Sequence, residues 1–203
     1  MAALRATGGV YSREIDGLTA AEIYAKYVTE GDGIALFYHG PLSNWWRAPY
    51  EHGGRAFNCT EQQMMVSKAM LNGDWASVDV IMACDGAWDG TQRDFNKYPR
   101  EQQRLGRLVK NPATGAFDPK VWDALCVDLV TVANLPKYAQ HPLLLEVLAL
   151  SKGRLLVEAS PIDRIWGIGL RRDDPRALDP AQWQGKNYLG QVLTRVRRYL
   201  CGF

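Results

Sequence analysis

The chain has few of the residues from which disulfide frameworks and metal sites are built. Its 203 residues include four cysteines and three histidines. No two cysteines form a Cys-x-x-Cys pair, and no histidines stand at the intervals of zinc ligands. The sequence therefore predicts no metal site. Scattered, unpaired cysteines are typical of reduced thiols, so we expect a cytoplasmic protein.

Long apolar runs and a strong charge of one sign are also missing. No apolar stretch approaches the ~20 residues of a membrane helix, and the N-terminus has no signal-peptide core. We therefore expect no association with a membrane. The formal net charge of +2 is too small to drive strong non-specific binding to a nucleic-acid backbone. Arginine outnumbers lysine two to one, however, which leaves local phosphate recognition open.

What is present is a set of helical patterns with a few short strand patterns between them. This mixture predicts an α+β fold, a mostly helical single domain with a few short strands. Compact apolar runs predict strands at residues 34–38, 55–59 and 154–159. Capping residues and periodicity predict helices at about 19–28, from 60, 75–84, 91–109 with a bend or break at Pro99, 118–132, 141–150 and 188–200.

Two of these helices show an apolar stripe that we expect to be buried. In the helix that starts with Pro119 at its first position, apolar residues recur at three- and four-residue steps. They are Val121, Trp122, Leu125, Leu129 and Val132. In the last helix the stripe is Leu189, Val192, Leu193, Val196 and Leu200, and Arg195 and Arg198 lie away from it.

The start of the helix at Thr60 carries an unusual pair of charges. Thr60 and Gln63 form a capping-box pattern, which places Glu61 in the first helical turn. Lys68 follows seven residues later, so both side chains point to one side, roughly 10 Å apart along the axis. A sugar-sized ligand could touch both. The competing explanation is ordinary helix electrostatics, with a glutamate at the positive end of the dipole and a surface lysine.

Three further segments combine polar groups with aromatic rings or glycines at the ends of elements. Leu42-Ser43-Asn44-Trp45-Trp46 follows the first predicted strand, and residues 163–169 follow the last one. Residues 183–187, Trp-Gln-Gly-Lys-Asn, precede the final helix and resemble an anion cradle, since a helix N-terminus presents free N–H groups. Pro180 and Asn187 stand where a Walker A loop needs glycine and Ser or Thr, so this is not that motif.

Taken in order, these segments resemble the NADAR (YbiA-like) domain family. The resemblance rests on Phe37, residues 42–44, 60–62, 68–69, 105–107, 121–122, 156–159, 163–169, 183–187, 189–190 and 196–197. It covers about residues 34–200 in unbroken order. We therefore expect an N-terminal extension at residues 1–33 and a NADAR/YbiA-like domain at residues 34–203.

The resemblance implies an N-glycosidase that works without metal or cofactor. Family members remove ADP-ribose from modified guanine in nucleic acid or hydrolyse early intermediates of the riboflavin pathway. The first substrate class is our expectation for this chain, with an ADP-ribosylated nucleotide or nucleic acid as partner, and the second is the alternative. A third reading is a non-catalytic module that binds ADP-ribose or NAD. The sequence does not fix the oligomeric state.

The resemblance also implies roles for individual residues. Glu61 matches the family's catalytic glutamate and Lys68 its helix lysine, and Asp163 belongs to an Asp-x-x-Trp-Gly segment with Trp166 and Gly167. Binding roles are implied for Asn44, Trp122, Trp166, Gly167 and Asn187. The residue types themselves suggest that Arg47 or the turn with Lys186 holds a diphosphate and that Gly169 lets the backbone come close to a ligand. One position departs from the family pattern: Gln103 stands where a lysine is common, two residues before Leu105-Gly106-Arg107.

Two chemical routes fit these residues. Cleavage of an N-glycosidic bond builds positive charge on C1′ and the ring oxygen, which a carboxylate such as Glu61 would stabilise while orienting water. Lys68 could instead attack the sugar and form a Schiff base, which requires a neutral amine and hence a desolvated site. Both routes need Glu61 at a surface that a ligand can reach, rather than deep in the interior or in bulk solvent.

Overall fold

The computed structural model describes residues 13–84 and 92–203. Within these ranges it confirms an α+β fold with seven α-helices and five short strands. The helices are α1 Ala20–Tyr27, α2 Thr60–Leu71, α3 Trp75–Met82, α4 Gln92–Gly106, α5 Pro119–Gln140, α6 Pro142–Ala149 and α7 Tyr188–Cys201. The strands are β1 Val28–Gly31, β2 Ile34–Phe37, β3 Tyr50–His52, β4 Arg55–Phe57 and β5 Leu155–Glu158. The turns that the sequence predicts at 85–86 and 89–90 lie outside the described residues.

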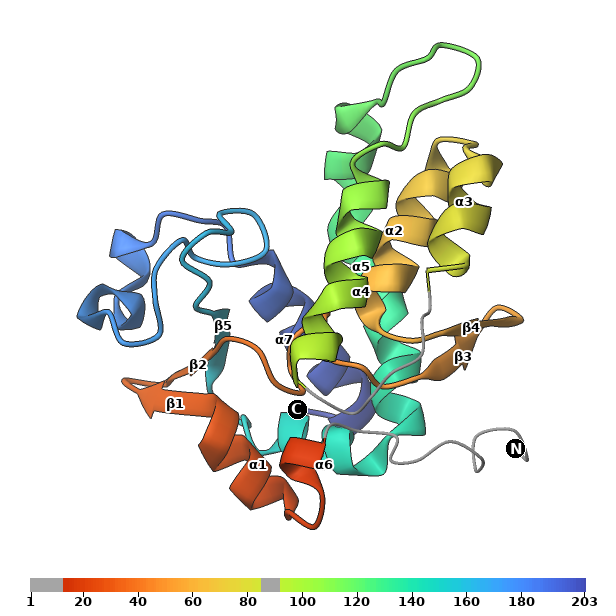
Figure 1. Cartoon of the computed structure of the whole chain (residues 1–203). Helices are drawn as coiled ribbons and strands as arrows, with labels where there is room; N and C mark the ends of the chain where they lie inside the picture. The colour runs from red at the N-terminus through yellow and green to blue at the C-terminus, as the bar shows by residue number, and fades with distance from the viewer. Residues whose placement is uncertain (1–12, 85–91) are drawn as a thin grey trace. The chain divides into compact units, whose positions relative to one another are not determined.

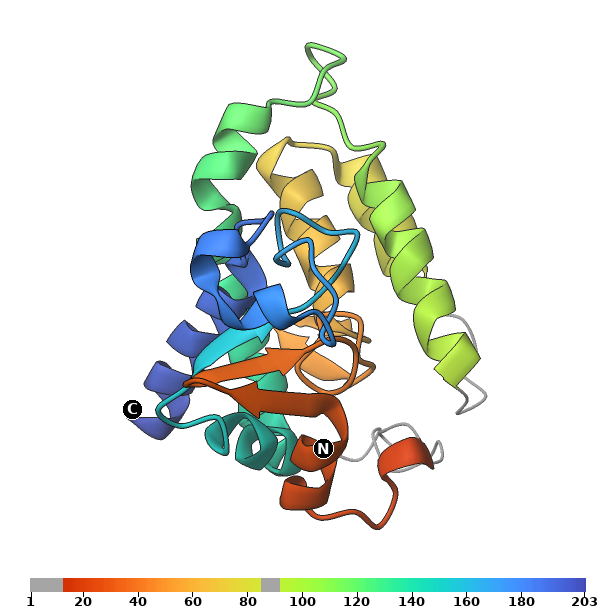
Figure 2. The ribbon, with the colours of Figure 1, turned by 90° about the vertical axis from the view of Figure 1, so that its left-hand side faces the viewer.

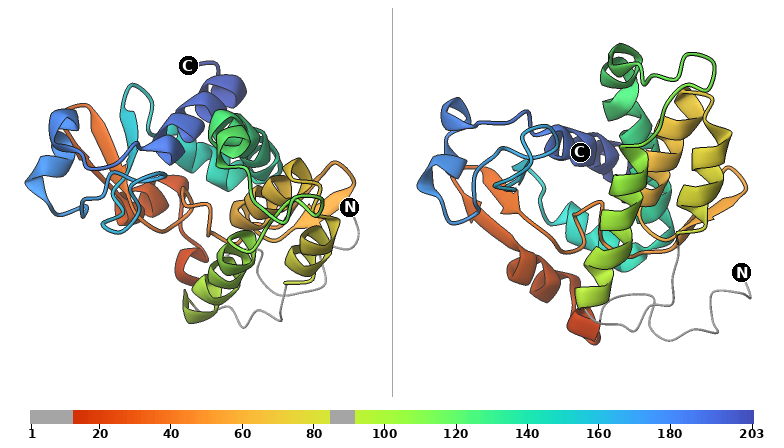
Figure 3. Two further views of the ribbon diagram at one scale, coloured as in Figure 1. Left: turned by 90° about the horizontal axis from the view of Figure 1, so that it is seen from above. Right: turned by 45° about the horizontal axis from the view of Figure 1, so that its top comes forward.

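The chain forms two compact units, and neither is continuous in sequence. The first unit comprises residues 1–18 and 44–126, and the second comprises residues 19–43 and 127–203. The boundary between them falls inside α5. In the first unit, α2 packs against α3 and α4, and β3 and β4 form an antiparallel hairpin (Figures 1 and 3).

The second unit is built on a three-stranded sheet in the order β1-β2-β5 (Figure 2). β1 runs antiparallel to β2, and β5 runs parallel to it. Its buried core includes Ile34, Leu36, Val157, Ala159, Ile168, Leu170 and Ala177. The sequence did not predict β1. Residues 20–31, expected to belong to an N-terminal extension, supply α1 and an edge strand of this sheet.

The sequence predicts capping boxes at Thr19 with Glu22 and at Thr60 with Gln63; the first is confirmed, and the second is wrong. Thr19 caps α1: its hydroxyl accepts from the N–H of Glu22 at 3.3 Å, and its own N–H donates to the Glu22 carboxylate at 2.8 Å. At α2 the cap is Cys59, whose side chain makes no capping hydrogen bond and instead donates to Oε1 of Gln102 at 3.3 Å, and Thr60 is the first helical residue. The reason is tertiary, because Gln63 turns its side-chain amide to Nδ1 of His52 at 2.6 Å instead of reaching back to the helix start.

The long helix α5 differs most from its prediction. It begins at Pro119 as expected but continues to Gln140, through Pro136, instead of ending near Val132. The buried face is also a different one. Three members of the predicted stripe, Val121, Leu125 and Val132, are exposed. The buried positions are Cys126, Val130, Thr131, Ala133, Asn134, Lys137 and Tyr138, so polar residues on the inner face hid the correct period.

The other predicted helices agree more closely with the structure. α4 continues through Pro99, where the sequence predicts a bend or break. α6 begins with Pro142 at its first position. α7 buries Leu189, Val192, Leu193 and Val196 and exposes Arg195 and Arg198, as expected. No helix in the described part of the chain combines the length and the apolarity needed to cross a lipid bilayer.

Gly190 allows α7 to approach β5 closely, and this contact yields a stability prediction. A Cβ atom at position 190 would lie 2.0 Å from the carbonyl oxygen of Leu156. We expect Gly190→Ala to lower the free energy of unfolding by roughly 1–3 kcal/mol or more, because backbone must shift to relieve the overlap. Urea denaturation measures the change. The control is Arg198→Ala on the exposed face of α7, and equal stability of the two variants would contradict the prediction.

Candidate functional site

Glu61 lies in the first turn of α2, as the sequence predicts, but it is more buried than expected. The residue is only 4% exposed, whereas both chemical routes require a carboxylate that a ligand can reach, so its catalytic role stays a prediction. Its backbone N–H donates to the carbonyl of Asn44 at 3.0 Å, which joins the helix start to the 42–46 segment. A carboxylate in this position benefits from the positive end of the helix dipole. Low exposure also strengthens its effect on any charge that forms beside it, because little water screens the interaction.

A network of buried amides holds the start of α2 in place. The side chain of Gln62 accepts from the N–H of Asn58 at 2.9 Å and donates to the carbonyl of Ile81 at 3.1 Å. From α4, the amide nitrogen of Gln102 donates to the side-chain oxygen of Asn58 at 3.1 Å and to the carbonyl of Cys84 at 2.9 Å. These bonds join α3 and α4 to Asn58, which precedes α2, and to Gln62 in the first turn of α2.

No sequence pattern indicated this network. Substitution of Gln102 tests the contribution of the network to stability. Gln102 is fully buried, whereas its neighbour Gln103 is half-buried. We expect Gln102→Ala to lower the free energy of unfolding by about 1–3 kcal/mol, because Asn58 and Cys84 then lose a buried partner. Gln103→Ala is the matched control and should change stability by less than about 0.5 kcal/mol. Thermal and urea unfolding measure both variants, and an equal loss in the two would contradict the assignment.

Lys68 lies two turns along α2 in a partly aromatic environment. Its ammonium donates to the carbonyl of Gly106 at 2.8 Å. The nitrogen lies 4.4 Å from the ring centre of Phe117 and 5.8 Å from that of Trp122. Trp122, predicted to stack on the substrate, is therefore a neighbour of the helix lysine. No sequence pattern indicated a role for Phe117.

Opposing influences act on the protonation of Lys68. Burial lowers its pKa below the ordinary value, the positive charge of Arg107 lowers it further, and the charge of Glu61 raises it. The aromatic rings and the Gly106 carbonyl favour the charged form as well. Desolvation is the largest influence, and the net direction is downward. A lowered pKa is what a lysine needs to act as a neutral nucleophile.

The 42–46 segment contributes a mostly buried entry to the Glu61 helix. Asn44 is 5% exposed and Trp46 is 2% exposed. Trp45 and Arg47 are half-buried. In the second unit, the fully buried Lys137 donates to the carbonyls of Pro41 and Ser43, each at 2.9 Å, and thereby fixes the preceding part of the same loop. Lys137 was not predicted, because a lysine on a helix is normally solvated.

In the second unit, the 163–169 segment forms a rigid turn. One carboxylate oxygen of Asp163 accepts from the N–H groups of Ile165 and Trp166, each at 2.8 Å. Asp163 thus shapes the turn that presents Trp166, and its predicted catalytic role remains a prediction. Trp166 is half-buried and meets the ring of Tyr188 edge-on, with centroids 6.0 Å apart.

The predicted glycines allow close backbone approaches beside this turn. A Cβ at Gly167 would lie 2.9 Å from the carbonyl oxygen of Glu158, and Gly169 has a φ of +71°. The N–H of Asn187 donates to the carbonyl of Gly167 at 3.2 Å. The 163–169 and 183–187 segments therefore form one connected pair of loops.

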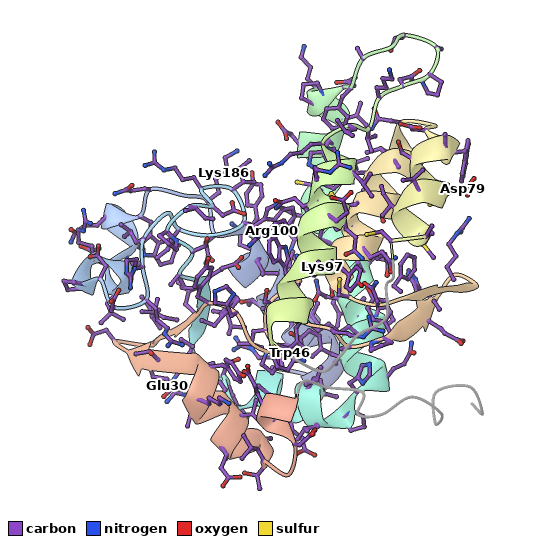
Figure 4. The ribbon with its side chains drawn as sticks, viewed as in Figure 1. Glu30, Trp46, Asp79, Lys97, Arg100 and Lys186 are labelled. Atoms are coloured by element: carbon purple, nitrogen blue, oxygen red, sulfur yellow. The ribbon has the colours of Figure 1, made fainter. Side chains whose placement is uncertain are left out.

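Asn187 and Lys186 differ in what they offer a ligand. The side-chain amide of Asn187 is committed to β5: it donates to the Leu156 carbonyl at 2.9 Å and accepts from the Glu158 N–H at 3.0 Å. Its contribution is therefore to position the loop at the start of α7. Lys186 is exposed, with its ammonium 5.2 Å from the ring centre of Tyr188 (Figure 4). Its charge is available to an anion.

The predicted site residues thus fall into two groups. The first unit brings together Glu61, Asn44, Lys68 and Trp122, with Arg107 acting on Lys68. The second unit brings together Asp163, Trp166, Gly167 and Asn187. Within the described ranges, no three His, Cys, Asp or Glu side chains are grouped so that they could hold a metal ion.

Comparisons with known proteins show the family to which the chain belongs. The model of the NADAR domain matches residues 36–201. The chain is 39% identical over 176 residues to N-glycosidase R617 of Acanthamoeba polyphaga mimivirus, covering 80% of this chain and 94% of the viral protein. It is 32% identical over 108 residues to the maize riboflavin biosynthesis protein PYRR, covering 52% of this chain and 15% of the maize protein. The fold is similar to the solved structure of the E. coli protein YbiA, with a TM-score of 0.61 and 22% identity. The match covers 85% of this chain and 88% of the YbiA chain.

Proposed function

Because this chain belongs to the NADAR domain family, we propose that it is an N-glycosidase and that its substrate is ADP-ribosylated guanine in nucleic acid. The similarity to the mimivirus N-glycosidase, nearly all of which the chain covers, supports N-glycosidase activity. The observation that carries the mechanism is Glu61, a buried carboxylate at a helix start, two turns before a lysine of lowered pKa.

The proposed chemistry follows from the charge that bond cleavage creates. The bond between C1′ and the base nitrogen breaks, its electron pair leaves with the base, and positive charge develops on C1′ and the ring oxygen. Glu61 stabilises this charge from its poorly hydrated position. Water then adds its oxygen to C1′ and gives up a proton, and the base takes up a proton. The products are free ADP-ribose and the restored base.

Lys68 provides a second route, whose transition state also carries positive charge on C1′ and the ring oxygen. Its neutral amine forms a bond to C1′ as the base departs, and opening of the sugar ring yields an imine that water hydrolyses. The lowered pKa of Lys68 favours this route, while the cation–π contacts with Phe117 and Trp122 oppose it. On either route Glu61 stabilises the charge at C1′.

Two candidate substrates, assayed in parallel, test the proposed substrate class. One assay supplies DNA that carries ADP-ribosylated guanosine and measures released ADP-ribose by chromatography. The other supplies a phosphorylated ribosylamino intermediate of riboflavin synthesis, the class suggested by similarity to the maize protein. We expect turnover of the first substrate, at least tenfold above the second in kcat/KM.

Each other outcome points to a different function. Turnover of the ribosylamino compound alone would replace the proposed substrate with the alternative. Tight binding of ADP-ribose without turnover of either compound, unchanged in Glu61→Gln, would identify a binding module. Absence of both binding and turnover would remove the proposal altogether.

A further inference from the structure

α4 and Arg107, the residue that follows it, carry a row of cations along one exposed face. Lys97, Arg100, Arg104 and Arg107 recur at steps of three, four and three residues, which places them on one side of a helix. All four are exposed, and Figure 4 labels Lys97 and Arg100 on α4. The opposite face is buried through Pro99, Gln102 and Gly106. We call these four cations the α4 basic stripe.

The charge of the stripe is large compared with that of the whole protein. Between residues 97 and 107 the only carboxylate is Glu101, which forms an ion pair with Arg104 at 2.7 Å. The segment therefore has a local charge of +3, against +2 for the entire chain. Among the described residues, no carboxylate forms an ion pair with Lys97, Arg100 or Arg107. A solvated face usually mixes charges of both signs, so this concentration indicates an anionic partner.

The stripe ends near the candidate site, because its last member, Arg107, lies close to Lys68. The charge of Arg107 acts on Lys68, and the Lys68 ammonium is bonded to Gly106, the next residue to Arg107. Ten residues of helix span about 15 Å. Since one nucleic-acid strand carries a charge every ~3.4 Å of helix axis, roughly four phosphates fit along the stripe. A free nucleotide carries too few phosphates to engage it.

We propose that the α4 basic stripe binds the sugar–phosphate backbone next to the modified nucleotide. The inference rests on the proposed glycosidase function for its biological meaning. Binding by the stripe does not require catalysis, however, and is measured separately. Gly106 lets α4 approach Met65 of α2 closely, and Gln102 is bonded to Asn58 just before α2, so the cations are presented on a rigid support, as phosphate recognition requires.

Binding of an unmodified 15-nucleotide single-stranded DNA to the full chain tests the stripe. The variant Lys97→Gln/Arg100→Gln/Arg104→Gln removes three charges and keeps Arg107. The matched control, Lys26→Gln/Lys152→Gln/Arg198→Gln, removes three exposed cations of the second unit. Fluorescence anisotropy gives Kd between 50 and 200 mM salt, and thermal unfolding verifies that both variants are folded.

We expect the stripe variant to weaken binding and to flatten the salt dependence. Three lost phosphate contacts reduce the slope of log K against log salt by roughly two in single-stranded DNA. The control should keep the wild-type slope. Equal slopes in the two variants, or no measurable binding by the wild type at 50 mM salt, would overturn the proposal. So would equally tight binding of a polyglutamate peptide of the same charge.

A kinetic comparison separates this inference from the proposed function. On ADP-ribosylated DNA we expect the stripe variant to raise KM at least tenfold with kcat unchanged. On the ADP-ribosylated mononucleoside we expect its kcat/KM to equal that of the wild type. An equal loss on both substrates would show that the stripe acts on the site rather than on the polymer. If the wild type cleaves neither substrate, the proposed function fails. The binding experiment still decides whether the stripe binds DNA.

Discussion

Glu61→Gln is expected to reduce kcat on ADP-ribosylated guanosine DNA by at least about 10²-fold and to leave binding of ADP-ribose nearly unchanged. The glutamine keeps the shape of the side chain but removes the negative charge. Its effect should therefore fall on the transition state, in which C1′ is positive, more than on the ground state. Single-turnover rates and calorimetric titration of ADP-ribose measure the two effects separately.

A second glutamate variant controls for a general loss of folding in this experiment. Glu51→Gln changes an exposed glutamate of β3, in the same unit. We expect its kcat to equal that of the wild type. If Glu61→Gln keeps more than a tenth of the wild-type rate, Glu61 does not carry the chemistry. If it loses ADP-ribose binding in proportion to rate, its role is to hold the ligand.

Lys68→Met should have an effect at least as large if the lysine is the nucleophile. The methionine keeps the length of the side chain and its contacts with Phe117 and Trp122, but it cannot form an imine. We expect a loss on the order of 10³-fold or more in kcat. Borohydride added during turnover should attach the sugar covalently to the wild type and not to the variant, and intact-protein mass spectrometry detects the difference.

The pH dependence provides an independent test of the same route. A neutral amine is required, so the rate should rise with pH through the lowered pKa of Lys68. Arg107→Gln removes a positive charge that lowers this pKa, so the rising limb should move to higher pH. Arg198→Gln, which removes an exposed cation of the second unit, should leave the profile in place. If wild type shows no borohydride adduct and Arg107→Gln shows no shift, water activated by Glu61 is the operating route.

The parts of the fold that could be predicted were those determined by local sequence. The capping box at Thr19, Pro119 and Pro142 at first helical positions, and the apolar stripe of α7 act over a few residues. Tertiary contacts determined the rest. β1 is polar and partly exposed, with the sequence Val-Thr-Glu-Gly, and exists because it pairs with β2. The inner face of α5 holds Asn134 and Lys137, so its hydrophobic period indicated the wrong face.

The candidate site shows the same division. The placement of Glu61 in a first helical turn could be predicted, because it depends on the start of one helix. Its burial could not, since this comes from elements that surround α2 within the first unit. The buried amide of Gln102 and the ring of Phe117 are brought to α2 by the fold alone. The α4 basic stripe had a visible signal in its three- and four-residue spacing.

The antiparallel pairing of Val28–Gly31 with Ile34–Phe37 affects how the domain can be isolated. The family match begins at residue 36, inside the second of these strands. A fragment cut there would leave β5 with no complete neighbour and would expose unpaired backbone N–H and C=O groups along the sheet. Such an open border recruits strands from other molecules and promotes aggregation. Expression boundaries should therefore be drawn ahead of Thr19, where the capped first helix begins.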